Sequence, residues 1–354
     1  MTRLEKLRAA LPAGSDGIIV TDEINQRYLT GFAYTDGYVI VTRTAALLMC
    51  DFRYIEAAKA KADPAFEVRM FEGKRSEWMP RLMDEFGVKA IAYEDETLAC
   101  AALEGLKATL PGREFLAAGS LLSDLREFKD DGEIEKLIAA QRVAEAALEH
   151  IMGYITPDRT EIDVALELEF YMRAHGAQST SFSTIAVSGT ASSLPHGEPR
   201  PVKLERGFLT MDFGALKDGY CSDMTRTVVI GKADDEMKRI YNTVLTAQTE
   251  AFKAIREGVT GCEIDKIARD IIYGAGYEGC FGHGLGHGVG MYIHEEPRLS
   301  PMGKKTLARG HVVTDEPGIY IEGKYGCRIE DMIVIRPDGR VEDITLAPHE
   351  LIEL

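Results

Sequence analysis

The sequence predicts a two-domain α/β protein whose second domain contains an internal repeat. The chain has 354 residues, more than the usual size of about 100 to 200 residues for one domain. Short β-branched runs alternate with helical stretches up to about residue 130, and long helices followed by strands and glycine-rich turns come after it. A similar order of motifs then occurs twice in this second part.

The composition excludes several classes of protein. The formal net charge of -16 argues against nucleic acid and anionic membranes as partners. No apolar run approaches the roughly 20 residues that span a bilayer, and the N-terminal MTRLEKLRAALP is typical of a charged helix rather than a secretory signal. The six cysteines are scattered without a Cys-x-x-Cys pair, which indicates reduced thiols. We therefore expect a cytoplasmic protein.

Residues 1–130 are predicted to form the first domain. Its strands are expected at GIIV, YVIV and AIAY, and its helices at RYIEAAKAKA, SEWMPRLMDEF and LACAALEGLKATL. This part of the sequence contains no metal-ligand cluster, phosphate loop or nucleophile motif. We therefore assign no chemistry to its own residues.

Residues 131–354 are predicted to form the second domain, in which four motifs occur twice in the same order. A long helix from Glu133 is followed by TEIDVAL, and another from Glu236 is followed by CEIDKIA. RGFLTMDFG, from Arg206, parallels RGHVVTDEPG, from Arg309, and GYCSDMTRTVV parallels GCRIEDMIVI. The order indicates a duplicated unit, which often builds its site on the axis between the copies.

The repeat pairs Asp212 with Glu316 and Asp223 with Glu330. Turn residues fall midway between the two acids of each copy, so a hairpin would bring those acids nearly opposite each other. Like charges on cross-strand neighbours destabilise a sheet, and two divalent metal ions would remove the repulsion. With His287 as the natural fifth ligand, such a site suits manganese, cobalt, iron or zinc.

The stretch FGHGLGHGVG, residues 281–290, carries His283 and His287 four residues apart. Its five glycines disfavour a helix, because each costs about 1 kcal/mol relative to alanine. Both histidines are therefore expected on a loop or an irregular strand. The stretch does not fit the dinucleotide motif GxGxxG, and the chain offers neither GxSxG nor a complete HExxH.

Four motifs in this order resemble the signature of the metallopeptidase family that contains Xaa-Pro aminopeptidase, prolidase and methionine aminopeptidase: MDFGALKDGYCSDMTRT, FGHGLGHGVGMYIHEEP, TDEPGIYI and GCRIED. NQRYLTGF and CDFRYIEAA resemble the N-terminal domain of the proline-directed branch and of creatinase. The resemblance covers nearly the whole chain. It implies a small creatinase-like α/β domain followed by a pita-bread α+β catalytic domain, a curved antiparallel sheet backed by helices.

The resemblance further implies a centre of two divalent metal ions, with Mn²⁺ expected and Co²⁺, Zn²⁺ or Fe²⁺ as alternatives. Its ligands would be Asp212, Asp223, His287, Glu316 and Glu330. Glu316, which precedes Pro-Gly, is also expected to act in catalysis as the proton shuttle. Creatinase shares the fold without these ligands, so the intact set favours a hydrolase.

Three histidines in the matched motifs are implied to surround the substrate. His196, His283 and His294 would hydrogen-bond the carbonyl oxygen and orient the residues beside the scissile bond, as catalytic and substrate-binding groups. Arg298 matches an arginine that in prolidases can bind the free carboxylate of a dipeptide. An ordinary surface arginine is an equal alternative there.

Other residues are expected to support these groups. Arg328 lies two residues before Glu330 and would share its strand face, so it is expected to orient carboxylates, and Thr225 is assigned the same role. Cys327 is interpreted as a small buried apolar residue, with a redox-sensitive thiol near the metals as the alternative. The candidates for packing against a proline ring are Phe182, Tyr292 and Tyr320.

The expected activity is that of an Xaa-Pro aminopeptidase on short proline-containing peptides. An Xaa-Pro dipeptidase is the alternative within the same chemistry. Methionine aminopeptidase is disfavoured by the N-terminal domain, and a non-catalytic peptide-binding module is disfavoured by the intact ligand set. The resemblance also implies a homodimer.

Overall fold

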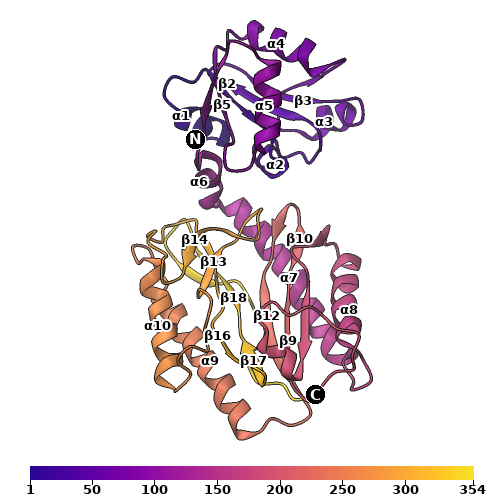
Figure 1. Cartoon of the computed structure of the whole chain (residues 1–354), viewed down its shortest axis with the longest axis vertical. Coiled ribbons are helices and arrows are strands. Elements are labelled where there is room, and N and C mark those ends of the chain that lie inside the picture. The colour runs from indigo at the N-terminus through magenta and orange to yellow at the C-terminus, as the bar shows by residue number, and fades with distance from the viewer. The chain divides into compact units, whose positions relative to one another are not determined.

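The computed structural model describes all 354 residues and divides into two compact units, residues 1–126 and 127–354 (Figure 1). Each unit has its own sheet and its own helices. The sequence predicts a boundary between two domains after residue 130. Whether the two parts fold as separate domains divided there stays a prediction. None of the helices combines the length and the apolar composition needed to cross a membrane.

The first unit is built around one six-stranded sheet. Its order is β4-β3-β2-β1-β5-β6, in which β1, β2 and β3 are antiparallel neighbours and the outer pairs are parallel. The strands are β1 Gly17–Val20, β2 Tyr38–Thr42, β3 Ala46–Cys50, β4 Glu67–Met70, β5 Ala90–Tyr93 and β6 Glu114–Ala117. The helices are α1 Arg3–Ala10, α2 Glu23–Thr30, α3 Ile55–Lys61, α4 Arg75–Glu85, α5 Cys100–Thr109 and α6 Leu121–Glu127.

The sequence located the central elements of this unit correctly. GIIV, YVIV and AIAY are β1, β2 and β5, and the three expected helices are α3, α4 and α5. Apolar side chains from β1, β2, β3 and β5 pack with those of α4 and α5 in one buried cluster, which includes Ile19, Ile40 and Met79. Two of the remaining strands, β4 and β6, lie at the edges of the sheet, and none of their residues is fully buried.

The second unit contains two helix pairs with strands between them (Figure 1). α7 Asp131–Tyr154 and α8 Glu161–Ala174 form the first pair, and α9 Asp235–Ala254 and α10 Gly261–Gly274 form the second. α8 and α10 each start at a threonine N-cap, and the cap amide donates to an acid three residues later, Asp163 at 2.8 Å and Glu263 at 2.9 Å. These capping boxes align residue 160 with residue 260.

This alignment corrects one detail of the predicted repeat. The Glu-Ile-Asp motifs align Glu161 with Glu263, but Glu161 is the first residue of α8 and Glu263 is the third residue of α10. Matching the letters of the two motifs therefore places the helices two residues out of their structural register. The repeat of helix, break and helix itself is present in both copies.

All strand pairs of the second unit are antiparallel. Their sheets have the orders β12-β9-β8, β11-β10-β7, β14-β13-β15-β18-β19 and β16-β17. The first copy holds β7 Ser179–Thr180, β8 Ile185–Ser188, a 3₁₀ turn at Gly189–Ser193, β9 Gly207–Phe213, β10 Ala215–Lys217, β11 Tyr220–Cys221 and β12 Met224–Ile230. The second holds β13 Gly286–Gly288, β14 Glu295–Leu299, β15 Val312–Asp315, β16 Gly318–Ile321, β17 Tyr325–Arg328, β18 Asp331–Ile335 and β19 Val341–Asp343.

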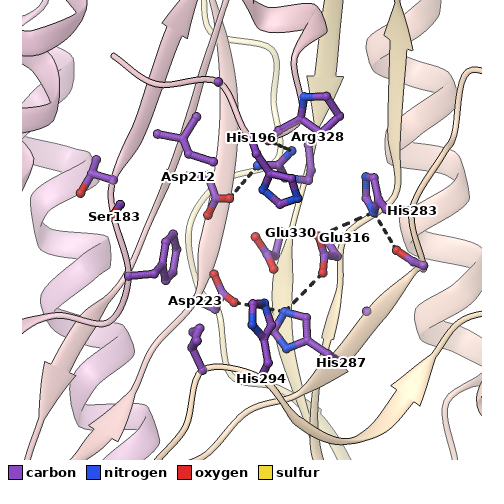
Figure 2. A pocket seen from close by; sticks show the side chains of 18 of the residues that line it. Ser183, His196, Asp212, Asp223, His283, His287, His294, Glu316, Arg328 and Glu330 are labelled. Atoms are coloured by element: carbon purple, nitrogen blue, oxygen red, sulfur yellow. Dashed lines mark hydrogen bonds and ion pairs between the residues drawn. The ribbon is translucent and has the colours of Figure 1, made fainter.

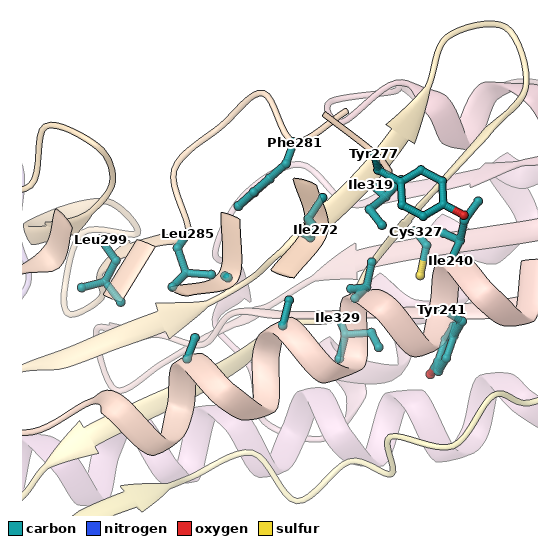
Figure 3. Packing of buried hydrophobic residues seen from close by; sticks show 14 of the residues in the cluster. Ile240, Tyr241, Ile272, Tyr277, Phe281, Leu285, Leu299, Ile319, Cys327 and Ile329 are labelled. Atoms are coloured by element: carbon teal, nitrogen blue, oxygen red, sulfur yellow. The ribbon is translucent and has the colours of Figure 1, made fainter. Parts of the chain in front are cut away.

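Each helix pair covers its strands through a separate apolar cluster. In the second cluster, Phe281 and Leu285 of the glycine-rich stretch pack beside Ile272 of α10 (Figure 3). Burying a side chain of this kind stabilises a fold by about 1.5 to 3 kcal/mol, so the two apolar residues anchor a segment that is otherwise rich in glycine. Cys327 is fully buried in the same cluster, as expected for a small apolar residue.

Candidate metal centre and substrate cavity

A cavity of about 770 Å³ in the second unit brings together most of the residues singled out in the sequence (Figure 2). Both copies of the repeat contribute to its walls. The predicted residues that line it are Phe182, His196, Asp212, Asp223, His283, His287, His294, Arg298, Glu316, Arg328 and Glu330. Thr225 lies behind the lining, and Tyr292 and Tyr320 are not part of it.

The first pair of acids comes from the β9–β12 hairpin. Asp212 is paired with Thr225 across the hairpin, so Asp223 is offset from Asp212 by two residues. The two acids are therefore diagonal neighbours on one face, where the expectation was a nearly opposite pair. The chain turns between them at Asp218 and Gly219, which have φ values of 51° and 83°.

The second pair of acids is directly opposite. Asp315 faces Asp331 between β15 and β18, and Gly318 faces Arg328 between β16 and β17. The same register places Glu316 opposite Glu330. Adjacent residues of an extended chain point to opposite faces, so Glu316 and Glu330 lie on the face opposite to that of Asp315 and Asp331. Both glutamate side chains line the cavity.

His287 completes the group from β13, an irregular strand as expected. Its Nδ1 lies 3.0 Å from the carbonyl oxygen of Gly288, which can only accept a hydrogen bond. The proton therefore resides on Nδ1, and the lone pair of Nε2 faces Asp223 Oδ2 and Glu316 Oε1, each at 3.5 Å. This tautomer is the one that a metal ligand needs.

The close approach of strands at this point requires glycine. A Cβ on Gly286 would lie 2.0 Å from the carbonyl oxygen of Thr314, and one on Gly288 would lie 2.1 Å from that of Glu296. Glycine at these positions lets β13 approach its neighbours closely enough for His287 to reach the carboxylates.

The electrostatics of this group favour bound cations. Burial, together with Asp212 and Glu316, raises the pKa of Asp223 well above its usual value. Burial, reinforced by Asp223, does the same to the pKa of Glu330, and burial raises the pKa of Glu316 to about 8. Two like charges about 4 Å apart repel by about 4 kcal/mol at an effective dielectric constant of 20.

The donor set fits divalent metal ions. Asp212 Oδ1 is buried without a hydrogen-bond partner, and ligand atoms of Asp223, His287 and Glu330 lie within 4.8 Å of one another. Oxygen-rich donors combined with one imidazole nitrogen are typical of transition-metal sites. Cations at this position would neutralise the carboxylates and use the orphan oxygen of Asp212.

Arg328 and Thr225, which the sequence predicts to support the ligands, form hydrogen bonds with two of the carboxylates. Arg328 Nη2 donates to Asp212 Oδ2 at 2.6 Å, and its Nε donates to Thr225 Oγ1 at 2.9 Å. Thr225 Oγ1 in turn donates to Glu330 Oε2 at 2.7 Å. Arg328 thereby leaves Oδ1 of Asp212 free for a metal ion.

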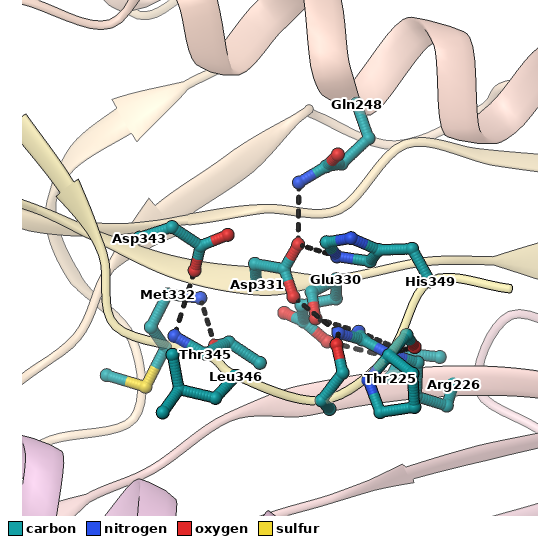
Figure 4. Close-up of polar contacts among 12 residues, drawn as sticks. Thr225, Arg226, Gln248, Glu330, Asp331, Met332, Asp343, Thr345, Leu346 and His349 are labelled. Atoms are coloured by element: carbon teal, nitrogen blue, oxygen red, sulfur yellow. Dashed lines mark hydrogen bonds and ion pairs between the residues drawn. The ribbon is translucent and has the colours of Figure 1, made fainter.

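A second arginine, Arg226, binds oxygen atoms of Glu330 and of the residue after it (Figure 4). Arg226 Nη1 donates to the carbonyl oxygen of Glu330 at 2.8 Å, and its Nη2 donates to Asp331 Oδ1 at 2.7 Å. Asp331 Oδ2 also accepts from Gln248 of α9 and lies 2.7 Å from Nε2 of His349. The sequence analysis did not identify this network. Its only local signal is that Arg226 follows Thr225 and Asp331 follows Glu330 in the duplicated motifs.

His283 is held beside the acids. Its Nδ1 lies 2.8 Å from the carbonyl oxygen of Gly284 and 4.0 Å from Glu316 Oε2, and its Nε2 lies 3.0 Å from the hydroxyl of Tyr320. Burial, helped by the charge of Arg328, lowers the pKa of His283 to about 4. The ring is therefore neutral, and both of its nitrogens are bound by protein groups in this structure. Burial likewise lowers the pKa of His294 at the cavity wall.

Two residues have contacts that the sequence analysis missed. Tyr320 was a candidate for packing a proline ring, but its hydroxyl accepts from Arg328 Nη1 at 2.6 Å and contacts His283. Thr314 accepts from the amide of His287 at 3.1 Å and donates to Glu316 Oε1 at 3.2 Å. Its position two residues before Glu316, on the same strand face, was the available signal.

Comparisons with known proteins agree with this geometry. The family model described as metallopeptidase family M24 matches residues 135–337, and that of the creatinase/prolidase N-terminal domain matches residues 3–128. A curated relative, the uncharacterised peptidase YqhT of Bacillus subtilis, is 41% identical over 99% of this chain and 100% of its own length.

Two solved structures resemble the whole chain. An Xaa-Pro dipeptidase from Bacillus anthracis superposes with a TM-score of 0.95 at 42% identity, covering 99% of both chains. An X-Pro aminopeptidase from Thermotoga maritima gives a TM-score of 0.93 at 35% identity, covering 99% of this chain and 100% of its own. The two differ in the proline-peptide activity for which they are named.

Proposed function

The chain belongs to metallopeptidase family M24, and we propose that it releases the N-terminal residue from short peptides whose second residue is proline. Membership of the family confirms the predicted fold class and makes the chain a metallopeptidase. The observation that carries the proposal is that all five predicted ligands line one cavity. One of their oxygen atoms, Asp212 Oδ1, is buried there without a hydrogen-bond partner.

In this proposal, two divalent metal ions would supply the activation of water and the stabilisation of negative charge on the peptide carbonyl. Asp212, Asp223, His287, Glu316 and Glu330 are the proposed ligands. All five line the cavity, and the metals would bind where the carboxylates crowd one another.

Glu316 is the proposed proton carrier. As in the hydrolysis of any amide, the proline nitrogen must gain a proton to leave as an amine. Glu316 lies among the other proposed ligands in the cavity, where a carboxylate can take a proton from water and pass it to that nitrogen. His196, His283 and His294 line the same cavity and are proposed to orient the peptide carbonyl.

A specific observation favours an Xaa-Pro dipeptidase as the second candidate. The exposed side chain of Arg298 lines the cavity, where it can bind a free carboxylate next to proline. The similar protein from Bacillus anthracis is also named an Xaa-Pro dipeptidase.

A paired assay separates the two candidates. Enzyme dialysed against Mn²⁺ is given Ala-Pro and Ala-Pro-Ala, and kcat/KM is measured for each. Preference for the tripeptide supports the aminopeptidase, whereas exclusive turnover of the dipeptide, lost in Arg298→Gln, contradicts it in favour of the dipeptidase. Release of methionine from peptides without proline would instead indicate a methionine aminopeptidase. Failure to bind Mn²⁺ or to cleave any of these peptides would leave a peptide-binding module.

Further parts of the proposal concern the metal, the location and the assembly of the protein. Mn²⁺ is the proposed metal because the site has four carboxylates and one imidazole, and metal analysis of purified protein tests it. The cytoplasm is proposed because all six cysteines are free, three of them buried. A homodimer is proposed from the family resemblance, and light scattering in solution tests it. We propose neither nucleic acid nor membrane as a partner, given the net charge of -16.

A further inference from the structure

The glycine-rich stretch depends on groups outside itself for its position. The carbonyl groups of Phe281 and His283 and the amide of Leu285 are bound by side chains of α10. Arg269 donates from Nη1 to the carbonyl oxygen of Phe281 at 2.7 Å and from Nη2 to that of His283 at 2.8 Å. The amide of Leu285 donates to Asp265 Oδ1 at 3.0 Å.

Asp265 and Arg269 fix each other in place. Arg269 donates from Nε to Asp265 Oδ2 and from Nη2 to Oδ1, both at 2.8 Å, across one turn of α10. Asp265 is buried, and the guanidinium also stacks 4.4 Å from the ring centre of Phe281. Only the rigid fork of arginine can bind a carboxylate with two hydrogen bonds and two carbonyl groups at the same time.

The segment held in this way leads directly to the proposed catalytic groups. His283 lies between two of the bound backbone groups. The carbonyl oxygen of Leu285 accepts from the amide of Glu316 at 2.8 Å, and His287 follows Leu285 by two residues. Movement of the segment would therefore displace a substrate-facing histidine and two proposed metal ligands together.

We propose that Asp265 and Arg269 are positioning residues, which act through the backbone of residues 281–285 on His283, His287 and Glu316. The inference rests on the proposed function for its catalytic consequence. Its effect on metal affinity rests on the hydrogen bonds described above and on His287 and Glu316 being metal ligands.

The first copy of the repeat contains a similar arrangement, with its acid at a different position of the second helix. Glu161, the first residue of α8, is fully buried and accepts from the amide of Ser188 at 2.7 Å and from that of Arg200 at 2.9 Å. Nε of Arg200 also donates to this carboxylate at 2.8 Å. His196 lies in the segment between these two anchored residues. In each copy, a buried acid of the second helix and an arginine thus hold the segment that carries a cavity histidine.

The test is the Mn²⁺ dissociation constant of Arg269→Lys, measured by calorimetry on the full chain. Lysine keeps the charge but loses the fork, so the dissociation constant should rise about 10- to 100-fold, as for other residues that orient metal ligands. Asp270→Asn is the matched control, because Asp270 is exposed on the same helix and pairs only with Lys266. Its dissociation constant should equal that of the wild type.

A double-mutant cycle tests the catalytic part. Because Arg269 is proposed to act partly through His283, Arg269→Lys should lower kcat for an Xaa-Pro peptide in the wild-type background and cause a smaller loss in His283→Ala, with Mn²⁺ saturating in both. Additive losses, or unchanged Mn²⁺ affinity in folded Arg269→Lys, would overturn the inference, and Arg269→Gln replaces the lysine variant if that one does not fold. Absence of proline-peptide turnover in the wild type contradicts the proposed function instead, while Mn²⁺ affinity still decides the positioning role.

Discussion

At the residue scale, the side chains that are proposed to bind the metals also lower the stability of the metal-free protein. Asp223, Glu316 and Glu330 are driven towards protonation by burial, and Asp223 and Glu330 also by neighbouring carboxylates. The protein without metal must either protonate these acids or bear their repulsion. Residues that bind the cations are therefore expected to destabilise the metal-free fold.

Asp223→Asn tests this trade-off. Removing one buried carboxylate relieves repulsion, so the metal-free variant should unfold at the same temperature as the metal-free wild type or at a higher one. Peptidase activity should fall by more than about 100-fold, because even residues behind a ligand cost up to that much. Scanning calorimetry with and without EDTA, beside a peptide assay, measures both effects.

Asp218→Asn is the control for this substitution. Asp218 lies in the turn of the same hairpin with a φ of 51°, a conformation that asparagine adopts readily. The Asp218→Asn variant should therefore retain peptidase activity. A metal-free Asp223→Asn protein that unfolds well below the wild type would contradict the proposed repulsion.

Glu161 provides a pH-dependent prediction outside the proposed ligand set. Hydrogen bonds from Arg200 and Ser188 outweigh burial and lower the pKa of Glu161 below its usual 4.5. A lowered folded pKa contributes stability that is present above pH 4.5 and is lost as the pH falls through the folded pKa. Glu161→Gln should thus cost about 2 kcal/mol near neutral pH, and the difference from wild type should shrink in acid. Urea unfolding at several pH values measures it, and a difference that grows in acid would contradict the assignment.

At the element scale, strands of alternating character could be predicted, but their exact pairing could not. Matching the letters of RGFLTMDFG and RGHVVTDEPG aligns Asp212 with Asp315, whereas Glu316 lines the cavity. Asp315 lies on the other face of β15, opposite Asp331, and is completely buried. A shift of one residue reverses the face of a strand, so matching the letters alone cannot choose between Asp315 and Glu316.

The proposed ligands could be selected from the sequence because each is near a recognisable local motif. Asp265 and Arg269 could not, because their function lies in contacts with backbone groups 12 to 20 residues further along the chain. Side chains that bind backbone leave no signature in the residue types that they contact. The role of Tyr320 was missed for a related reason, since its hydroxyl partners come from β17 and from the glycine-rich stretch.

Gly286→Ala tests the close packing of β13. The added Cβ would lie 2.0 Å from the backbone oxygen of Thr314, so β13 must shift away from β15. Overpacking of this kind costs up to about 3 kcal/mol, and the shift should carry His287 out of reach of the carboxylates. We expect a lower unfolding temperature and loss of Mn²⁺ binding, measured by calorimetry.

Gly282→Ala is the matched control in the same stretch, because a Cβ there has no neighbour within 4 Å. Its unfolding temperature and Mn²⁺ affinity should remain close to those of the wild type. Equal damage from both substitutions would show that the stretch needs flexibility rather than close approach at Gly286.

At the scale of the whole molecule, the proposed chemistry is confined to one of the two units. All five proposed ligands and every other cavity residue belong to residues 127–354. Residues 1–126 contain a sheet with its own apolar cluster and contribute no lining residue. Their contribution to stability should therefore be separable from that of the metals.

Metal removal tests this separation. A ligand at 100 times its dissociation constant stabilises the fold that binds it by about 2.7 kcal/mol, and the direct effect falls on the unit that contains the site. Hydrogen exchange read by mass spectrometry, with Mn²⁺ and after EDTA, should show slower exchange with metal in β9, β12, β15 and β18, whose strands carry or flank the ligands. β1, β2 and β3 should exchange at the same rate in both samples. Equal metal-dependent protection of β1 to β3 would mean that the two units unfold as one cooperative structure, and unchanged exchange in β9 and β12 would contradict the proposed ligands themselves.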